Sequence, residues 1–154
     1  MSQTKNKLLN MKTNFLPESG VLIVEPFGPL NTKDFDNIET VVDPWIKKNG
    51  PLLGLVIHAR TFPGWSGFSA LVRHLRFIRA HHRGIRRIAL AVDGTLPSVV
   101  SRIFAHFVQA EIRIFGYGRY PQALAWATEL EQKPKVGPRF RPDEERMIPN
   151  IPGF

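Results

Sequence analysis

The chain has 154 residues, of which 43% are hydrophobic and 22% are charged, as in one ordinary globular domain. No apolar run approaches the ~20 residues of a membrane-spanning helix, and the sequence MSQTKNKLLNMKTNFL lacks the apolar core of a secretory signal, so we expect a cytoplasmic protein. The lack of cysteine excludes disulfides, thiol nucleophiles and cysteine-ligated zinc. The net charge of +8 favours anionic partners, although such a charge can also serve solubility alone.

The first elements in chain order are an arm and a hairpin. Residues 1–11 are polar and lack periodicity, so we expect a disordered arm, with either Met1 or Met11 as the first translated residue. Residues 12–15 and 21–27 have the composition of strands, and the segment Pro-Glu-Ser-Gly between them is typical of a turn. This pattern predicts a β-hairpin.

A helix is predicted next, with Asn31 or Thr32 as its N-cap and Gly50 at its end. Pro44 interrupts the helical pattern, so the helix either kinks there or restarts with this proline at its first position. Acidic side chains in the first turn suit the positive end of the helix dipole. The acidic residues of this helix are Asp34, Asp36, Glu39 and Asp43.

Three strand–helix units follow the first helix. Apolar runs predict strands at residues 52–57, 88–92 and 112–115, and helical spacing predicts helices at residues 68–83, 97–107 and 120–131. This order predicts one α/β domain over residues 12–131, with a single layer of mixed, mostly parallel β-sheet and helices packed on it. Residues 132–154 contain five prolines and few aliphatic side chains, so we expect an extended Pro-rich tail.

With this order of elements, the chain resembles the SpoIIAA-like proteins of the STAS/Sec14-related superfamily from about residue 12 to residue 131. The segments that match best are LLGLVIHARTFPGWS, RRIALAV and AEIRIFGYGRYPQALAWA. The resemblance implies a STAS-type α/β fold and a non-enzymatic domain without a cofactor. It implies a role between that of a protein-interaction switch and that of a binder of small or lipidic ligands.

One residue of the resemblance is a candidate for modification. The better-known anti-sigma-factor antagonists carry a serine that is phosphorylated, at a helix start and in a pattern similar to Asp-Ser-Ser-Gly. The matching stretch here is Gly64, Trp65, Ser66 and Gly67, which lacks the Asp and has Trp65 at one hydroxyl position. We therefore expect Ser66 to be a helix N-cap, with phosphorylation as the alternative.

The loop and helix start around Ser66 are the predicted binding site. Large aromatic side chains at a helix entrance either pack there or form the wall of a ligand cleft. The following helix carries arginines at helical spacing and no acidic residue, so they face an anion, form a solvated surface, or are neutralised by the acidic first helix. The candidate binding residues are Phe62, Gly64, Trp65, Ser66, Gly67, Phe68, Arg73 and Arg76.

Catalytic and metal sites have little support in the sequence. The histidines at positions 58, 74, 81, 82 and 106 do not follow a metal-binding spacing, and no HExxH, GxSxG or glycine-rich phosphate motif is present. His58 follows a predicted strand and could activate a hydroxyl, but no acidic residue lies near it along the chain. We therefore predict no catalytic residue and no metal ligand.

Two functions remain open at this point. The first is a non-catalytic STAS-like module for protein interaction or regulation through residues 65–76, with an acidic protein partner. The alternative is a carrier or sensor of an apolar or amphiphilic anionic ligand, such as a lipid or acyl species, with its chain between the second and third helices and its headgroup on arginine. A homodimer is also open. Nucleic-acid binding rests on charge alone and is not expected.

Overall fold

In the computed structural model, residues 8–81, 83–94, 102 and 110–129 are described. Five strands form one sheet in the order β1-β2-β3-β4-β5. β1 (Met11–Leu16) and β2 (Val21–Pro26) form the antiparallel hairpin, and β3 (Leu52–Ala59), β4 (Ile85–Val92) and β5 (Glu111–Phe115) continue the sheet in parallel. The predicted mixed, mostly parallel sheet is therefore confirmed.

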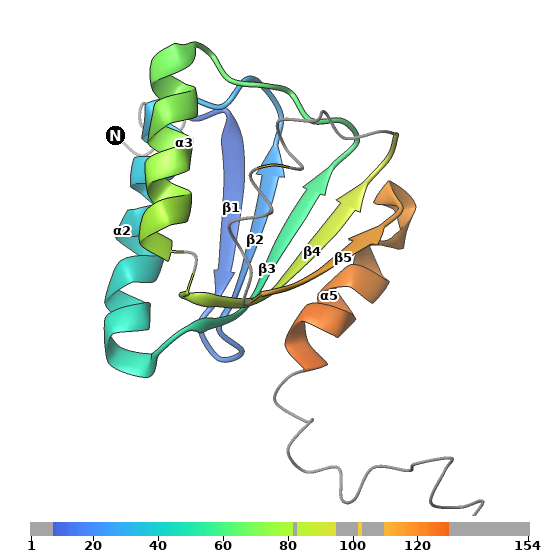
Figure 1. The fold of residues 1–154 in the computed structure, drawn as a ribbon. Helices are drawn as coiled ribbons and strands as arrows, with labels where there is room; N and C mark the ends of the chain where they lie inside the picture. The colour runs from blue at the N-terminus through green and yellow to red at the C-terminus, as the bar shows by residue number, and fades with distance from the viewer. Residues whose placement is uncertain (1–7, 82, 95–101, 103–109, 130–154) are drawn as a thin grey trace, which may run out of the picture.

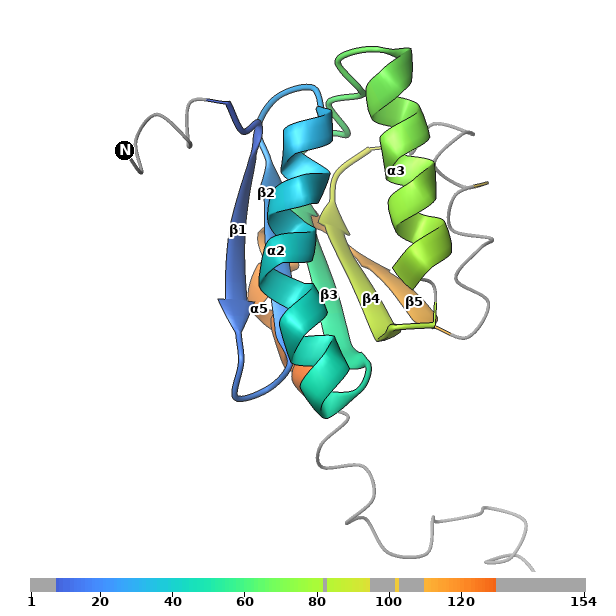
Figure 2. The ribbon, with the colours of Figure 1, turned by 90° about the vertical axis from the view of Figure 1, so that its left-hand side faces the viewer.

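Helices cover both faces of this sheet. α2 (Thr32–Asn49) and α3 (Phe68–His81) lie side by side on one face, whereas α5 (Tyr120–Thr128), which follows the short 3-10 helix η1 (Tyr117–Arg119), lies on the other (Figures 1 and 2). The helix predicted at residues 97–107 and the tail at residues 132–154 lie outside the described residues. Within the described part of the chain, no helix is long and apolar enough to cross a membrane.

The start of α2 is fixed by a capping box. The side-chain oxygen of Asn31 accepts a hydrogen bond from the backbone N–H of Asp34 at 3.1 Å, and the Asp34 carboxylate accepts one from the backbone N–H of Asn31 at 2.9 Å. Burial raises the pKa of Asp34, although hydrogen bonds from backbone N–H groups, that of Asn31 first, act in the opposite direction. Pro44 lies inside a continuous helix and does not restart it, and Gly50 caps its end.

Alternate side chains of the central strands enter two separate cores. In β2, Leu22 and Val24 pack under α2 and α3, whereas Val21 and Ile23 pack under α5. All four are buried, which explains why the strand reads as a continuous apolar run rather than an alternating one.

α5 approaches the sheet closely because β3 has a glycine beneath it. A Cβ atom placed on Gly54 would lie 2.9 Å from the Cβ of Ala127 and 2.9 Å from its carbonyl oxygen. No larger side chain fits at this contact unless the helix moves.

Candidate functional site

The loop between β3 and α3 is tied to the loop before α2. The N–H of Leu30 donates to the carbonyl of Gly64, and the N–H of Ser66 donates to the carbonyl of Leu30, each at 2.8 Å, so that Leu30 and Trp65 form an isolated parallel bridge. Gly64 has a φ of +84°, a conformation that favours glycine. The predicted binding loop therefore has a defined backbone path at the carboxyl ends of β2 and β3.

The aromatic residues of this loop divide into packed and exposed ones. The rings of Phe62 and Trp65 meet edge to face, with centroids 4.9 Å apart, and both side chains are half-buried against the core under α2 and α3. Phe68, the first residue of α3, exposes 80% of its surface. Phe62 and Trp65 pack against the core and also line a pocket.

α3 begins at residue 68, as predicted, but its cap residue is not the predicted one. The carbonyl of Gly67 accepts the first helical hydrogen bond, from the N–H of Leu71 at 3.2 Å, so Gly67 occupies the cap position. Ser66 lies one residue earlier, its backbone N–H is engaged in the bridge with Leu30, and the residue is exposed. The predicted N-cap role of Ser66 is therefore wrong.

The two arginines of the predicted rim have different surroundings. Arg73 lies between two carboxylates of α2, with its Nη2 atom 3.1 Å from Asp36 and 2.7 Å from Glu39. Burial alone would lower the pKa of Arg73, but the hydrogen bonds to these carboxylates outweigh it and raise the pKa. Arg73 is thus neutralised by the acidic first helix, one of the alternatives left open by the sequence. Arg76 is exposed, and no carboxylate of the described residues lies within ion-pair distance of it.

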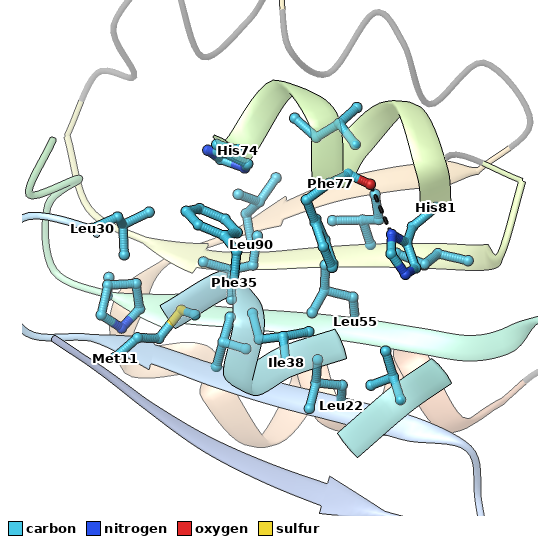
Figure 3. A pocket seen from close by; sticks show the side chains of 18 of the residues that line it. Met11, Leu22, Leu30, Phe35, Ile38, Leu55, His74, Phe77, His81 and Leu90 are labelled. Carbon is cyan, nitrogen blue, oxygen red and sulfur yellow. Dashed lines mark hydrogen bonds between the residues drawn. The ribbon is translucent and has the colours of Figure 1, made fainter. Parts of the chain in front are cut away.

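A cavity of about 110 Å³ lies between α2, α3 and the sheet (Figure 3). All of its described lining residues are apolar except His74 and His81, which both come from α3. The lining residues that are only half-buried are Pro26, Ile57, Phe62, Trp65 and His74. All of them lie toward the carboxyl ends of the strands or in the first half of α3, so the mouth of the cavity is at the predicted binding loop.

His74 is a neutral hydrogen-bonding group in the cavity wall. The Nε1–H of Trp65 donates to its Nδ1 atom at 3.0 Å, and its ring stacks on Phe35 with centroids 4.6 Å apart. Burial lowers the pKa of His74 to about 4. Because Nδ1 accepts a hydrogen bond, the proton of the neutral ring is on Nε2. Helical periodicity alone gives no signal for this role of His74.

His81, the second histidine of the cavity, is held by its own polar contacts. Its Nδ1 atom lies 2.8 Å from the carbonyl oxygen of Phe77 (Figure 3), and its Nε2 atom lies 2.7 Å from a carboxylate oxygen of Asp43 in α2. Both partners are hydrogen-bond acceptors, so both ring nitrogens are engaged. His81 therefore joins α3 to α2 and presents no free polar atom to the cavity.

A third histidine, His58, lies in a cluster of polar and aromatic side chains on the face of the sheet that α5 covers. Its Nδ1 atom lies 3.1 Å from Glu25, its Nε2 atom lies 3.2 Å from the carbonyl oxygen of Tyr117, and its ring is stacked between Tyr117 and Tyr120. Burial, and then the charge of Glu25, raises the pKa of Tyr120. No acidic residue lies near His58 along the chain, but the parallel pairing of β2 with β3 brings Glu25 beside it. With both nitrogens engaged, the ring has none left to activate a nucleophile.

Comparison with known proteins gives a family but no individual relative. The sequence matches the model of the SpoIIAA-like family over residues 21–128, from the start of β2 to the end of α5. Neither the comparison with curated proteins nor that with solved structures found a match. The matched region is more than half of the chain and includes the loop between β3 and α3 and all described residues that line the cavity except Met11. The chain belongs to the SpoIIAA-like family of STAS-type domains.

Proposed function

We propose that this SpoIIAA-like domain is a non-catalytic interaction module, and that its protein partner binds the carboxyl edge of the sheet around residues 62–76. The observation that carries this proposal is Phe68, which exposes 80% of its surface at the end of a loop with a defined backbone path. Aromatic side chains presented in this way are the anchors that protein interfaces use most, because they bury a large area with little loss of side-chain entropy.

Two further exposed apolar side chains support the same edge. Phe27, after β2, exposes 68% of its surface, and Leu8, before β1, exposes 58%. The carbonyl of Leu8 accepts a hydrogen bond from the side chain of Asn31, next to the bridge between Leu30 and Trp65. The three loops that carry the exposed side chains therefore lie together at the carboxyl edge (Figure 1). Ligands of α/β sheets bind preferentially at this edge.

The expected charge of the partner follows from which arginine of the predicted binding site is not paired with a carboxylate. Arg73 is occupied by Asp36 and Glu39, so it contributes no charge for a partner. Arg76 is exposed, and the chain has a net charge of +8. These features favour an acidic partner, with Phe68 as the apolar anchor and Arg76 as a source of attraction during encounter.

Site-specific crosslinking in the host tests this proposal. A photoreactive phenylalanine at position 68 should give one adduct of defined mass, whereas the same group at position 114 should not. Ile114 is a matched control because it exposes 62% of its surface and lies in β5, the last strand of the sheet, away from the proposed binding surface. Phe68→Ser should abolish recovery of the crosslinked partner by affinity purification, and Ile114→Ser should leave it unchanged. Equal recovery with both variants would refute the proposed edge.

The alternative of an anion carrier has one observation in its favour, the apolar cavity. However, that hypothesis placed the chain of the ligand between the second and third predicted helices, and the third, at residues 97–107, lies outside the described residues. The cavity lies beneath α2 and α3, which are the first and second. Of the two arginines predicted to bind, Arg73 is paired with carboxylates of α2. The cavity therefore favours a different class of ligand from the one that the sequence suggested.

A further inference from the structure

We propose that the cavity between α2, α3 and the sheet binds a small uncharged molecule with a single hydrogen-bond acceptor, such as a short ketone, aldehyde or ester. This site is separate from the exposed edge proposed for the protein partner. It rests on the size of the cavity, its apolar wall, one hydrogen-bond donor in that wall and the lack of a lysine or arginine among the described residues that line it.

The size of the cavity sets the size of the ligand. A volume of about 110 Å³ is smaller than an engineered apolar cavity of roughly 150 Å³ that binds benzene or xenon. At the packing density of protein interiors, such a volume holds about five non-hydrogen atoms. An acyl chain of a membrane lipid is several times larger and does not fit without separating α2 from the sheet.

The wall of the cavity offers one hydrogen-bond donor. Trp65 fixes the neutral form of His74 with its proton on Nε2, and no acceptor among the described residues takes that proton. His81 also lines the cavity, but both of its nitrogens are engaged with Phe77 and Asp43. A ligand with one carbonyl or ether oxygen can therefore satisfy His74, whereas further polar groups on the ligand would meet only apolar side chains.

The described lining of the cavity offers no lysine or arginine to an anionic ligand. Arg73, which precedes His74 in the chain, is held by Asp36 and Glu39 of α2. A carboxylate transferred into this cavity would lose its hydration without gaining a cation. The cavity therefore discriminates against charged analogues of the same shape.

Methyl NMR of the full chain with defined probes tests this inference. The probes are 2-butanone, butyrate and xenon, which share a small size but differ in charge and in hydrogen bonding. We expect 2-butanone to shift the methyl signals of Leu55, Leu90 and Ile38 with a dissociation constant on the order of 1 mM. Xenon should shift the same signals, and butyrate at equal concentration should not. Butyrate binding as tightly as 2-butanone, or no shift with xenon, would overturn the assignment.

Two variants distinguish the contribution of the cavity space to ligand binding from that of the His74 hydrogen-bond donor. His74→Phe keeps the ring and removes the Nε2–H group, so it should weaken 2-butanone about fivefold, the effect of one neutral hydrogen bond, and leave xenon binding intact. Ala59→Val adds two methyl groups to the lining and should weaken both probes. If His74→Phe leaves the affinity for 2-butanone unchanged, the donor is not used. If Ala59→Val leaves both affinities unchanged, the probes bind elsewhere.

Discussion

The two faces of the sheet are packed in different ways. Under α5 the contacts are made largely by small side chains, and Gly54 allows the helix backbone to approach β3. Under α2 and α3 the core consists of large side chains, mainly Leu, Ile and Phe, and a cavity of about 110 Å³ remains among them. Small residues close the gap by bringing backbones together. Large side chains from two helices and a sheet leave space where their shapes do not interlock, so the apolar cavity lies on that face.

The largest expected effect concerns pH and the cavity face. Because burial lowers the pKa of His74 to about 4, the unfolded chain binds a proton at this residue between pH 6.5 and 4 while the folded chain does not. Stability should therefore fall as the pH is lowered through this window, by up to about 3 kcal/mol. His74→Phe should remove this part of the pH dependence, measured by urea denaturation at a series of pH values.

The comparison of pH slopes isolates His74 from other groups. Asp34, whose pKa is raised by burial, acts with the opposite sign, since its contribution is lost as the pH rises through its folded pKa. It is present in both the wild type and the variant, so its effect cancels in the difference. If the two proteins have the same pH slope between 6.5 and 4, His74 is protonated in the folded state and the neutral cavity wall is incorrect.

The next effect concerns the face of the sheet that α5 covers, where the helix approaches β3 closely. Gly54→Ala would place its Cβ 2.9 Å from the Cβ and the carbonyl oxygen of Ala127, so α5 must shift outward. We expect a loss of about 2 kcal/mol in the free energy of unfolding, within the usual range for overpacking. Gly118→Ala is the matched control, because a Cβ at Gly118 meets no atom within 4 Å. Equal melting temperatures for both variants would mean that α5 is not closely packed.

The sequence predicts the fold more completely than the element boundaries. Apolar runs and helical spacing place the hairpin, α2, β3, α3 and β5, because each signal is local. β4 begins at Ile85 rather than at the predicted residue 88. The first residues of this strand were not predicted because Arg87 interrupts the apolar run. In the structure Arg87 is buried, its guanidinium stacks on the ring of Trp126, and it donates a hydrogen bond to the carbonyl oxygen of Trp126 at 2.6 Å. An arginine that is buried by a helix about forty positions later has no local signature.

The candidate site is predictable in location but not in its contacts. Turn residues and aromatic side chains place the loop at residues 62–67 correctly between β3 and α3. The environment of His74 depends on Phe35, and that of Arg73 depends on Asp36, so both require knowing that α2 and α3 share one face. Sequence spacing offers that arrangement only as one of several alternatives. The side chains that decide between a charged and a neutral ligand are therefore the ones that the sequence cannot assign.

A pair of equal substitutions tests the contrast between the two faces directly. Ala89 is fully buried under α5, so Ala89→Val should destabilise the protein by about 1.5 kcal/mol through overpacking. Ala59 lines the cavity, so Ala59→Val should be neutral or slightly stabilising because space is present to receive the methyl groups. Thermal denaturation of the two variants measures both effects. Equal losses would show that the cavity is not available to side chains.

The smallest effect distinguishes the two helices that cover the cavity. α2 begins with a side-chain cap, so Asn31→Ala should cost about 1 kcal/mol. α3 begins after Gly67, and Ser66 is exposed one residue before the cap, so Ser66→Ala should change the free energy of unfolding by less than ~0.5 kcal/mol. Urea denaturation of both variants gives the comparison. A loss for Ser66→Ala as large as that for Asn31→Ala would place the hydroxyl at the helix cap after all. A small loss leaves the hydroxyl free of a structural role, and thus accessible to a partner or to a kinase.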